Sequence, residues 1–196
     1  MIALVDYGVG NLVSVKKAIE WVGQECTITS DPGEVEEAAK VVLPGVGHFA
    51  STAKLRQSGL AEAMQRAIER QVPFLGICVG MQWMFAGSQE SPGTPGSGLF
   101  PGECERFPQS VKSPHVGWNQ LEIDASSTLF SGIASSSFVY FTHSFRVPLM
   151  ETTVACGEYG GRFSAAVERD HLFGVQFHPE KSGDIGLKLL SNFFAL

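Results

Sequence analysis

The sequence has few charged residues and no cluster of basic ones. Charged side chains make up 17% of the 196 residues, and the formal net charge is −6. Proteins that bind nucleic acid or an anionic membrane surface concentrate Lys and Arg on one face or in one segment. The composition therefore argues against nucleic acid and against a membrane as the main partner.

Long apolar runs and paired cysteines are also missing. No apolar stretch reaches transmembrane length, and no basic stretch with a long apolar core opens the chain. The four cysteines, at positions 26, 78, 104 and 156, form no Cys-x-x-Cys pair, which argues against a zinc site or a disulfide framework. The sequence gives no reason to expect a metal or another cofactor. Since no export signal is seen, we expect a cytoplasmic protein in which the thiols stay reduced.

The composition and the order of apolar segments predict an α/β fold. With 44% hydrophobic residues, the chain can bury a core without disulfide or metal crosslinks, and we expect one domain over residues 1–196. Strands are predicted at residues 1–5, 26–29, 41–43 and 74–77, with helical segments between them. This alternation predicts a mostly parallel central sheet with helices on both faces and a site at the carboxyl ends of the strands.

The second half of the chain has a different pattern. Residues 87–102 are rich in Gly, Pro and Ser, which predicts a long loop. Short strand-like runs follow at residues 118–123, 138–141, 152–156 and 162–168. We therefore expect an antiparallel or mixed extension of the sheet. A last strand over residues 172–177 and a helix over residues 183–194 complete the predicted fold.

Cys78 is the clearest candidate for chemistry. Gly76 and Gly80 flank it as Gly-x-Cys-x-Gly, the spacing of a nucleophile elbow with sulfur in place of the usual hydroxyl. Such a turn places the thiol at a helix N-terminus, which favours the thiolate. It also places the backbone N–H of Val79 where it can stabilise an oxyanion. The alternative is an ordinary buried thiol, which behaves as a small hydrophobe.

Two glycine-rich turns follow the first and third predicted strands. Gly45 and Gly47 form a loop whose backbone can approach a ligand closely and supply a second oxyanion N–H from Val46 or Gly47. A plain strand-to-helix turn is the alternative. Gly8-Val9-Gly10 has two glycines of a dinucleotide-binding fingerprint, but Val13 stands where the third belongs, which argues against that site.

His178 and Glu180 follow the last strand, with Pro179 between them. In an extended backbone, residues two apart project to the same side, and Pro179 is expected to keep the segment extended. A His held by a carboxylate can take the proton of a thiol, so both residues could act with Cys78. The alternative is a surface turn without catalytic function.

The segments Gly76–Gln82 and Phe177–Glu180 resemble the motifs of triad-type (class I) glutamine amidotransferases. Similar segments follow the family's order along nearly the whole chain, at residues 6–12, 44–49, 114–119, 140–145 and 178–182. They are most similar to the family's glutaminase subunits of histidine biosynthesis. The resemblance implies a flavodoxin-like fold and hydrolysis of L-glutamine to glutamate and ammonia by Cys78, His178 and Glu180.

The resemblance implies further roles and a partner. The backbone N–H groups of Val46 and Val79 would form the oxyanion hole. Substrate-binding residues would be Gly47, Gln82, His143 and Ser144. The partner would be a (β/α)8-barrel cyclase subunit that uses the ammonia to make imidazole glycerol phosphate and AICAR as part of a heterodimer. Residues near this interface would be Asn11, Trp118, Tyr140 and Lys181. We expect the partner, with its ligand bound, to raise a low basal activity.

Three other functions are compatible with parts of these patterns. A stand-alone cysteine hydrolase, similar to γ-glutamyl hydrolases, would be active without a partner. A non-catalytic subunit would keep the fold, but the intact set of Cys78, His178 and Glu180 argues against it. A sister amidotransferase subunit would serve another synthase and would differ in the acceptor of its ammonia.

Overall fold

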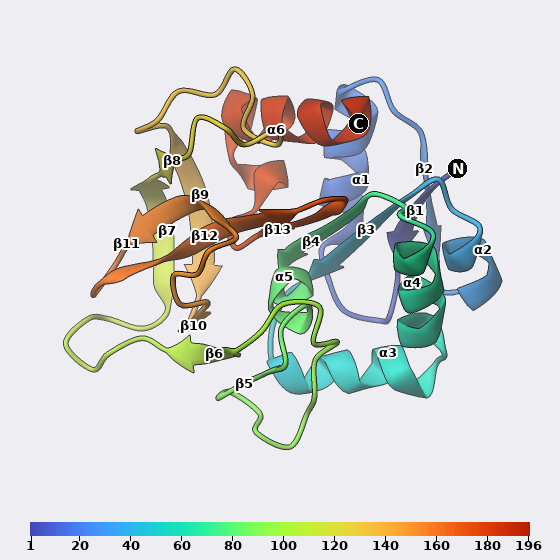
Figure 1. Ribbon diagram of the computed structural model, residues 1–196, viewed down its shortest axis with the longest axis horizontal. Helices are drawn as coiled ribbons and strands as arrows, with labels where there is room; N and C mark the ends of the chain where they lie inside the picture. The colour runs from blue at the N-terminus through green and yellow to red at the C-terminus, as the bar shows by residue number, and fades with distance from the viewer.

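The computed structural model describes residues 1–196 and has an eight-stranded sheet at its centre (Figure 1). Five neighbouring strands are parallel: β2 (Cys26–Thr29), β1 (Ile2–Val5), β3 (Lys40–Gly45), β4 (Phe74–Cys78) and β13 (Leu172–Val175). Three antiparallel strands extend the sheet beyond β13: β12 (Arg162–Arg169), β11 (Thr153–Glu158) and β8 (Glu122–Ile123). The predicted α/β sheet with an antiparallel extension is confirmed.

Helices cover both faces of this sheet. On one face lie α1 (Leu12–Trp21) and α6 (Gly183–Ala195), and on the other lie α2 (Pro32–Glu36), α3 (Ala53–Gln57) and α4 (Leu60–Glu69) (Figure 1). Successive side chains of a strand point to opposite faces. In β1, Ile2 and Leu4 therefore join the core under α1 and α6, and Ala3 and Val5 join the core under α4.

Two smaller sheets stand beside the antiparallel end. One pairs β7 (His115–Gln120) with β9 (Phe138–His143), and the other contains β10 (Phe145–Arg146), β6 (Glu103–Arg106) and β5 (Gly87–Ser88). The prediction of one strand over residues 118–123 was wrong. Leu121 still exchanges backbone hydrogen bonds with Ser136 and Ser137, beside β9, whereas β8 pairs with β11. The chain therefore changes sheets at this buried leucine.

The parallel strand order brings three segments of the predicted site to one edge. Gly45 of β3 is paired with Cys78 of β4, and Val175 of β13 is paired with Ile77. The loop after β3, the turn after β4 and the segment after β13 therefore leave the sheet side by side.

None of the helices combines the length and apolarity needed to cross a membrane. No three His, Cys, Asp or Glu side chains are grouped so as to hold a metal ion.

Candidate active site

Cys78 lies at a sharp turn between β4 and the short helix α5 (Val79–Trp83). Its backbone has φ 55° and ψ −110°, a conformation that costs a residue with a Cβ about 1–3 kcal/mol. The flanking glycines allow the close approach that this turn requires. A Cβ on Gly76 would lie 2.7 Å from the carbonyl oxygen of Gly80, and one on Gly80 would overlap the carbonyl oxygen of Leu43. The predicted strand–turn–helix geometry is present.

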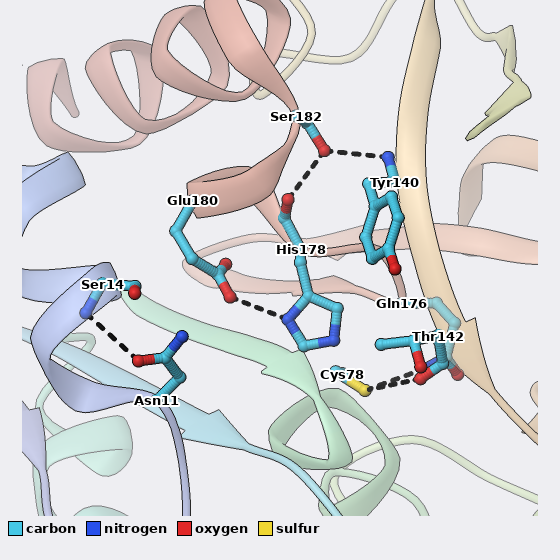
Figure 2. A network of polar contacts seen from close by, with 9 residues as sticks. All are labelled: Asn11, Ser14, Cys78, Tyr140, Thr142, Gln176, His178, Glu180 and Ser182. Atoms are coloured by element: carbon cyan, nitrogen blue, oxygen red, sulfur yellow. Dashed lines mark hydrogen bonds and ion pairs between the residues drawn. The ribbon is translucent and has the colours of Figure 1, made fainter. Parts of the chain in front are cut away.

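His178 and Glu180 form a buried pair beside Cys78. His178 Nδ1 lies 2.8 Å from Glu180 Oε1, and each side chain is 2% exposed. Figure 2 shows the imidazole between the carboxylate and the sulfur. The expectation of an extended segment was wrong, because Pro179–Lys181 forms a 3-10 turn, η2, directly after His178. The turn, rather than strand alternation, brings the two side chains together.

The surroundings of His178 favour its protonated form. Burial lowers the pKa of His178, but the Cys78 sulfur and the Glu180 carboxylate more than offset this and raise it to about 10. If Nδ1 donates its hydrogen to Glu180, the proton exchanged with the sulfur is the one at Nε2. Nε2 is buried and makes no hydrogen bond to another group. The imidazole can therefore hold a proton next to the Cys78 sulfur.

A cavity of about 390 Å³ opens beside this pair. It is lined by most of the residues that the sequence and the resemblance predict: Asn11, Val46, Gly47, Cys78, Val79, Gln82, His143, Ser144, His178 and Lys181. Glu180 lies behind His178 and lines a separate surface depression with α1 residues. Trp118 and Tyr140 do not line the cavity.

Other residues around the cavity were not predicted. Glu90, from the Gly- and Pro-rich segment, accepts a hydrogen bond from the Phe49 N–H at 2.7 Å and so anchors the loop after β3. The Thr142 carbonyl oxygen lies 4.0 Å from the Cys78 sulfur, and the Gln176 amide nitrogen lies 3.6 Å from it. A glutamine that follows an apolar strand carries no sequence signal of such a contact.

The side chains of Gln82 and His143 are bound inside the protein. Gln82 Nε2 donates to the Phe145 carbonyl oxygen at 3.1 Å, and His143 Nδ1 donates to the same oxygen at 2.8 Å. His143 Nε2 then accepts from His115 Nδ1 at 3.0 Å. Burial lowers the pKa of His115 to about 4 and that of His143 to about 3. His143 is therefore neutral and a weak base, and both of its ring nitrogens are already hydrogen-bonded, which suits a positioning role better than that of a general base.

The predicted interface residues lie around and beside the cavity mouth. Asn11 caps α1 by accepting from the Ser14 N–H at 3.4 Å. The Lys181 ammonium lies 5.7 Å from the centre of the Tyr140 ring, and that ring meets the Trp118 ring edge-on at 6.1 Å. Trp118 is 56% exposed, and the exposed side chains of Val116 and Phe138 lie on the same two strands. Val116, Trp118 and Phe138 form an apolar surface over β7 and β9.

The chain is similar to known proteins along its whole length. A family model described as "Glutamine amidotransferase class-I" matches residues 3–196. The imidazole glycerol phosphate synthase subunit HisH of Moorella thermoacetica is 47% identical over 98% of this chain and 93% of its own length. The HisH subunit of Dehalococcoides mccartyi is 47% identical over 100% of this chain and 97% of its own length. The HisH subunit of Methanocaldococcus jannaschii is 42% identical over 100% of both chains.

Solved structures agree on the fold. A glutamine amidotransferase crystal structure aligns with a TM-score of 0.76 at 19% identity over 95% of both chains. The structure of PurLQS from Thermotoga maritima aligns with a TM-score of 0.78 at 21% identity, over 99% of this chain and 97% of the other. At these identities the structures bear on the fold alone. The match to the family model and the curated relatives shows that the chain belongs to the class I glutamine amidotransferases, in the branch of imidazole glycerol phosphate synthase glutaminase subunits.

Proposed function

We propose that residues 1–196 form one catalytic domain that hydrolyses L-glutamine at Cys78 and delivers the ammonia to a cyclase subunit. The observation that carries this is the buried His178–Glu180 pair, which faces a strained cysteine at the edge of one cavity. A nucleophile, a base and a group that orients the base are what acyl transfer from an amide requires.

In the proposed first half-reaction, His178 takes the thiol proton and the Cys78 sulfur attacks the side-chain amide carbon of glutamine. The carbonyl oxygen becomes an oxyanion. The carbon–nitrogen bond then breaks, His178 returns its proton to the leaving nitrogen, and ammonia departs from a thioester. In the second half-reaction, His178 takes a proton from water, the hydroxide attacks the thioester, and the carbon–sulfur bond breaks. The products are glutamate and regenerated Cys78.

Backbone donors near the sulfur support the two oxyanion intermediates in this proposal. Val79 is the first residue of α5, so its N–H has no partner within the helix. Val46, which lines the cavity after β3, is the second donor. One such donor contributes about 3–4 kcal/mol in comparable sites. The residues proposed to hold the substrate are Gly47, Gln82, His143 and Ser144, all of which line the cavity.

The proposed partner follows from the product. Ammonia that escapes into water becomes ammonium and loses its nucleophilicity, so a synthase must receive it directly. We infer a heterodimer with a (β/α)8-barrel cyclase that makes imidazole glycerol phosphate and AICAR, docked over Asn11, Trp118, Tyr140 and Lys181. The four free thiols and a nucleophile that must stay reduced support a cytoplasmic location.

The decisive experiment measures glutamate release from glutamine by the chain alone and with the cyclase plus its ribonucleotide. We expect low activity alone, a strong increase with both additions, and none in Cys78→Ala. Full activity without the partner would instead identify a stand-alone cysteine hydrolase. Activation by a different synthase would identify a sister amidotransferase, and inactivity in every mixture would contradict the proposal.

A further inference from the structure

Two polar groups of opposite character lie next to the Cys78 sulfur. The Thr142 carbonyl oxygen, at 4.0 Å, can only accept a hydrogen, whereas the Gln176 Nε2 group, at 3.6 Å, donates one (Figure 2). We propose that the Gln176 amide is a further catalytic group, which stabilises the thiolate of Cys78 through an N–H···S hydrogen bond and is held in that orientation by Gln82. This inference rests on Cys78 being the nucleophile.

The orientation of the Gln176 amide can be deduced from the Phe145 carbonyl oxygen, to which Gln82 links it. The Phe145 carbonyl oxygen only accepts, so the Gln82 atom 3.1 Å from it is the amide nitrogen. The same nitrogen lies 3.0 Å from the Gln176 side chain, which must present its oxygen to it. The other end of the Gln176 amide, its NH2 group, is then the end that faces the sulfur. Exchanging the two ends of either amide would place two donors or two acceptors together.

Both glutamines are held rigidly. Gln176 is 0% exposed and Gln82 is 3% exposed. The backbone N–H of Gln176 continues the sheet by donating to the Ala165 carbonyl oxygen at 2.8 Å. Gln82 lies in α5, the helix that Cys78 precedes, and its side chain contacts that of Gln176. The amide therefore reaches the sulfur without having to be reordered during the reaction.

A donor in this position serves both half-reactions. A hydrogen bond made to the charged form of an acid favours that form, so the N–H group stabilises the thiolate before attack and again when the thioester carbon–sulfur bond breaks. The Thr142 carbonyl has the opposite effect, since it can accept a hydrogen only from the neutral thiol. The amide and the imidazolium of His178 are the two donors available to a charged sulfur.

The test measures how the reaction of Cys78 with methyl methanethiosulfonate, a small neutral thiol reagent, depends on pH. Modification at each cysteine is followed by mass spectrometry in the full chain. In Gln176→Met, which keeps the length and removes the donor, we expect the pH midpoint for Cys78 to rise by about one unit, so that the rate at pH values below both midpoints falls about tenfold. Gln176→Glu, which places a carboxyl oxygen at the sulfur, should raise the midpoint further.

Partly exposed Cys156 is the internal reference, and its rate should not change. Gln82→Leu keeps Gln176 but removes the hydrogen bond that orients its amide, so it should raise the Cys78 midpoint by a smaller amount. This variant decides the outcome if the Gln176 variants do not fold. An unchanged midpoint in any folded variant would overturn the proposal. The readout needs no glutamine turnover, so it is independent of the Cys78→Ala activity test. In turnover, Gln176→Met should lower kcat about tenfold and change KM less than twofold.

Discussion

Glu180 orients His178 through a single hydrogen bond of 2.8 Å, and its second oxygen has no partner. In Glu180→Gln, the amide nitrogen can donate to Nδ1, which moves the imidazole hydrogen to Nε2 and removes the proposed base. We expect kcat for glutamate release to fall by about 10²–10⁴, as when the equivalent carboxylate is lost in other triads, with KM nearly unchanged. Steady-state kinetics of the cyclase complex measure this.

The control for this prediction is Glu122→Gln, which removes an exposed carboxylate that pairs only with Arg162. Surface ion pairs of this kind contribute about 0–1 kcal/mol, so kcat and stability should both be unaffected. A Glu180→Gln variant that kept wild-type kcat would show that the backbone alone holds the imidazole in place.

Single residues differ in how far the sequence reveals their role. The sharp turn at Cys78 could be predicted because the flanking glycines meet a steric requirement of the elbow, and the pairing of His178 with Glu180 because it has a known chemical use. Gln176 could not, because its contact depends on which end of an amide faces the sulfur. Glu90 likewise lies in a loop whose path only the fold determines. Val46 and Gly47 were also indicated by their glycine-rich loop, whereas His143 and Ser144 came from the resemblance alone, and the proposed roles of all four are still predictions.

At the scale of elements, β4 and α5 pack closely against β3 at the site. A Cβ on Gly80 would overlap the Leu43 carbonyl oxygen, which belongs to the centre of the sheet and cannot move away. We expect Gly80→Ala to lower the free energy of unfolding by more than about 3 kcal/mol, the upper range for single substitutions that overfill a core. Urea unfolding followed by circular dichroism measures the change.

The matched control is Gly93→Ala in the loop before β6. No atom lies within 4 Å of a Cβ added there, and its φ is not left-handed. The change should therefore stay within about 0.5 kcal/mol. Equal stability of the two variants would mean that the elbow can open to admit a methyl group, contrary to the packing seen.

Elements formed by local patterns were predicted better than those formed by distant pairing. The parallel strands are apolar runs with helical segments between them, so their order and the edge that holds the site followed from general rules. The pairing of β7 with β9, and of β8 with β11 in the main sheet, depends on partners 18 or more residues away along the chain, which no local pattern specifies. The η2 turn after His178 was missed because Pro179 suits both an extended segment and the start of a helix.

At the scale of the whole molecule, His115 and His143 connect β7 and β9 to the antiparallel part of the main sheet. His115 stacks on Tyr159 at 4.1 Å and on Phe141 at 4.9 Å, and both histidine rings pack against Phe163. Burial lowers the pKa of His115 to about 4 and that of His143 to about 3. Folding therefore requires both rings to be neutral.

This requirement predicts that stability falls in mild acid. Above pH ~6.5 both states hold the rings neutral, whereas below it the unfolded chain binds protons that the folded one does not. We expect the free energy of unfolding, from urea titrations, to drop by roughly 3 kcal/mol between pH 6.5 and 4.5. His115→Gln should reduce this dependence by about half, and His48→Asn, at an exposed position, should leave it unchanged. A flat profile for the wild-type chain would contradict the prediction.

The last prediction concerns the apolar surface over β7 and β9. Val116, Trp118 and Phe138 are each more than half exposed, and a contiguous apolar surface of this kind is typical of a protein interface. Since Trp118 packs only edge-on against Tyr140, Trp118→Ala should leave the isolated chain's stability within about 0.5 kcal/mol. We expect it to weaken cyclase binding, measured by calorimetry, by about 2 kcal/mol or roughly thirtyfold in Kd.

Trp21 provides the matched comparison, because it is 80% exposed on α1, away from β7 and β9. If the cyclase covers the cavity mouth, Trp21→Ala should bind like the wild type, and only Trp118→Ala should lose affinity. Reversed effects would place the partner on the α1 side, beside Glu180, and no ammonia released into the cavity could then pass directly to it. The pair of variants therefore tests the docking face and the proposed delivery of ammonia together.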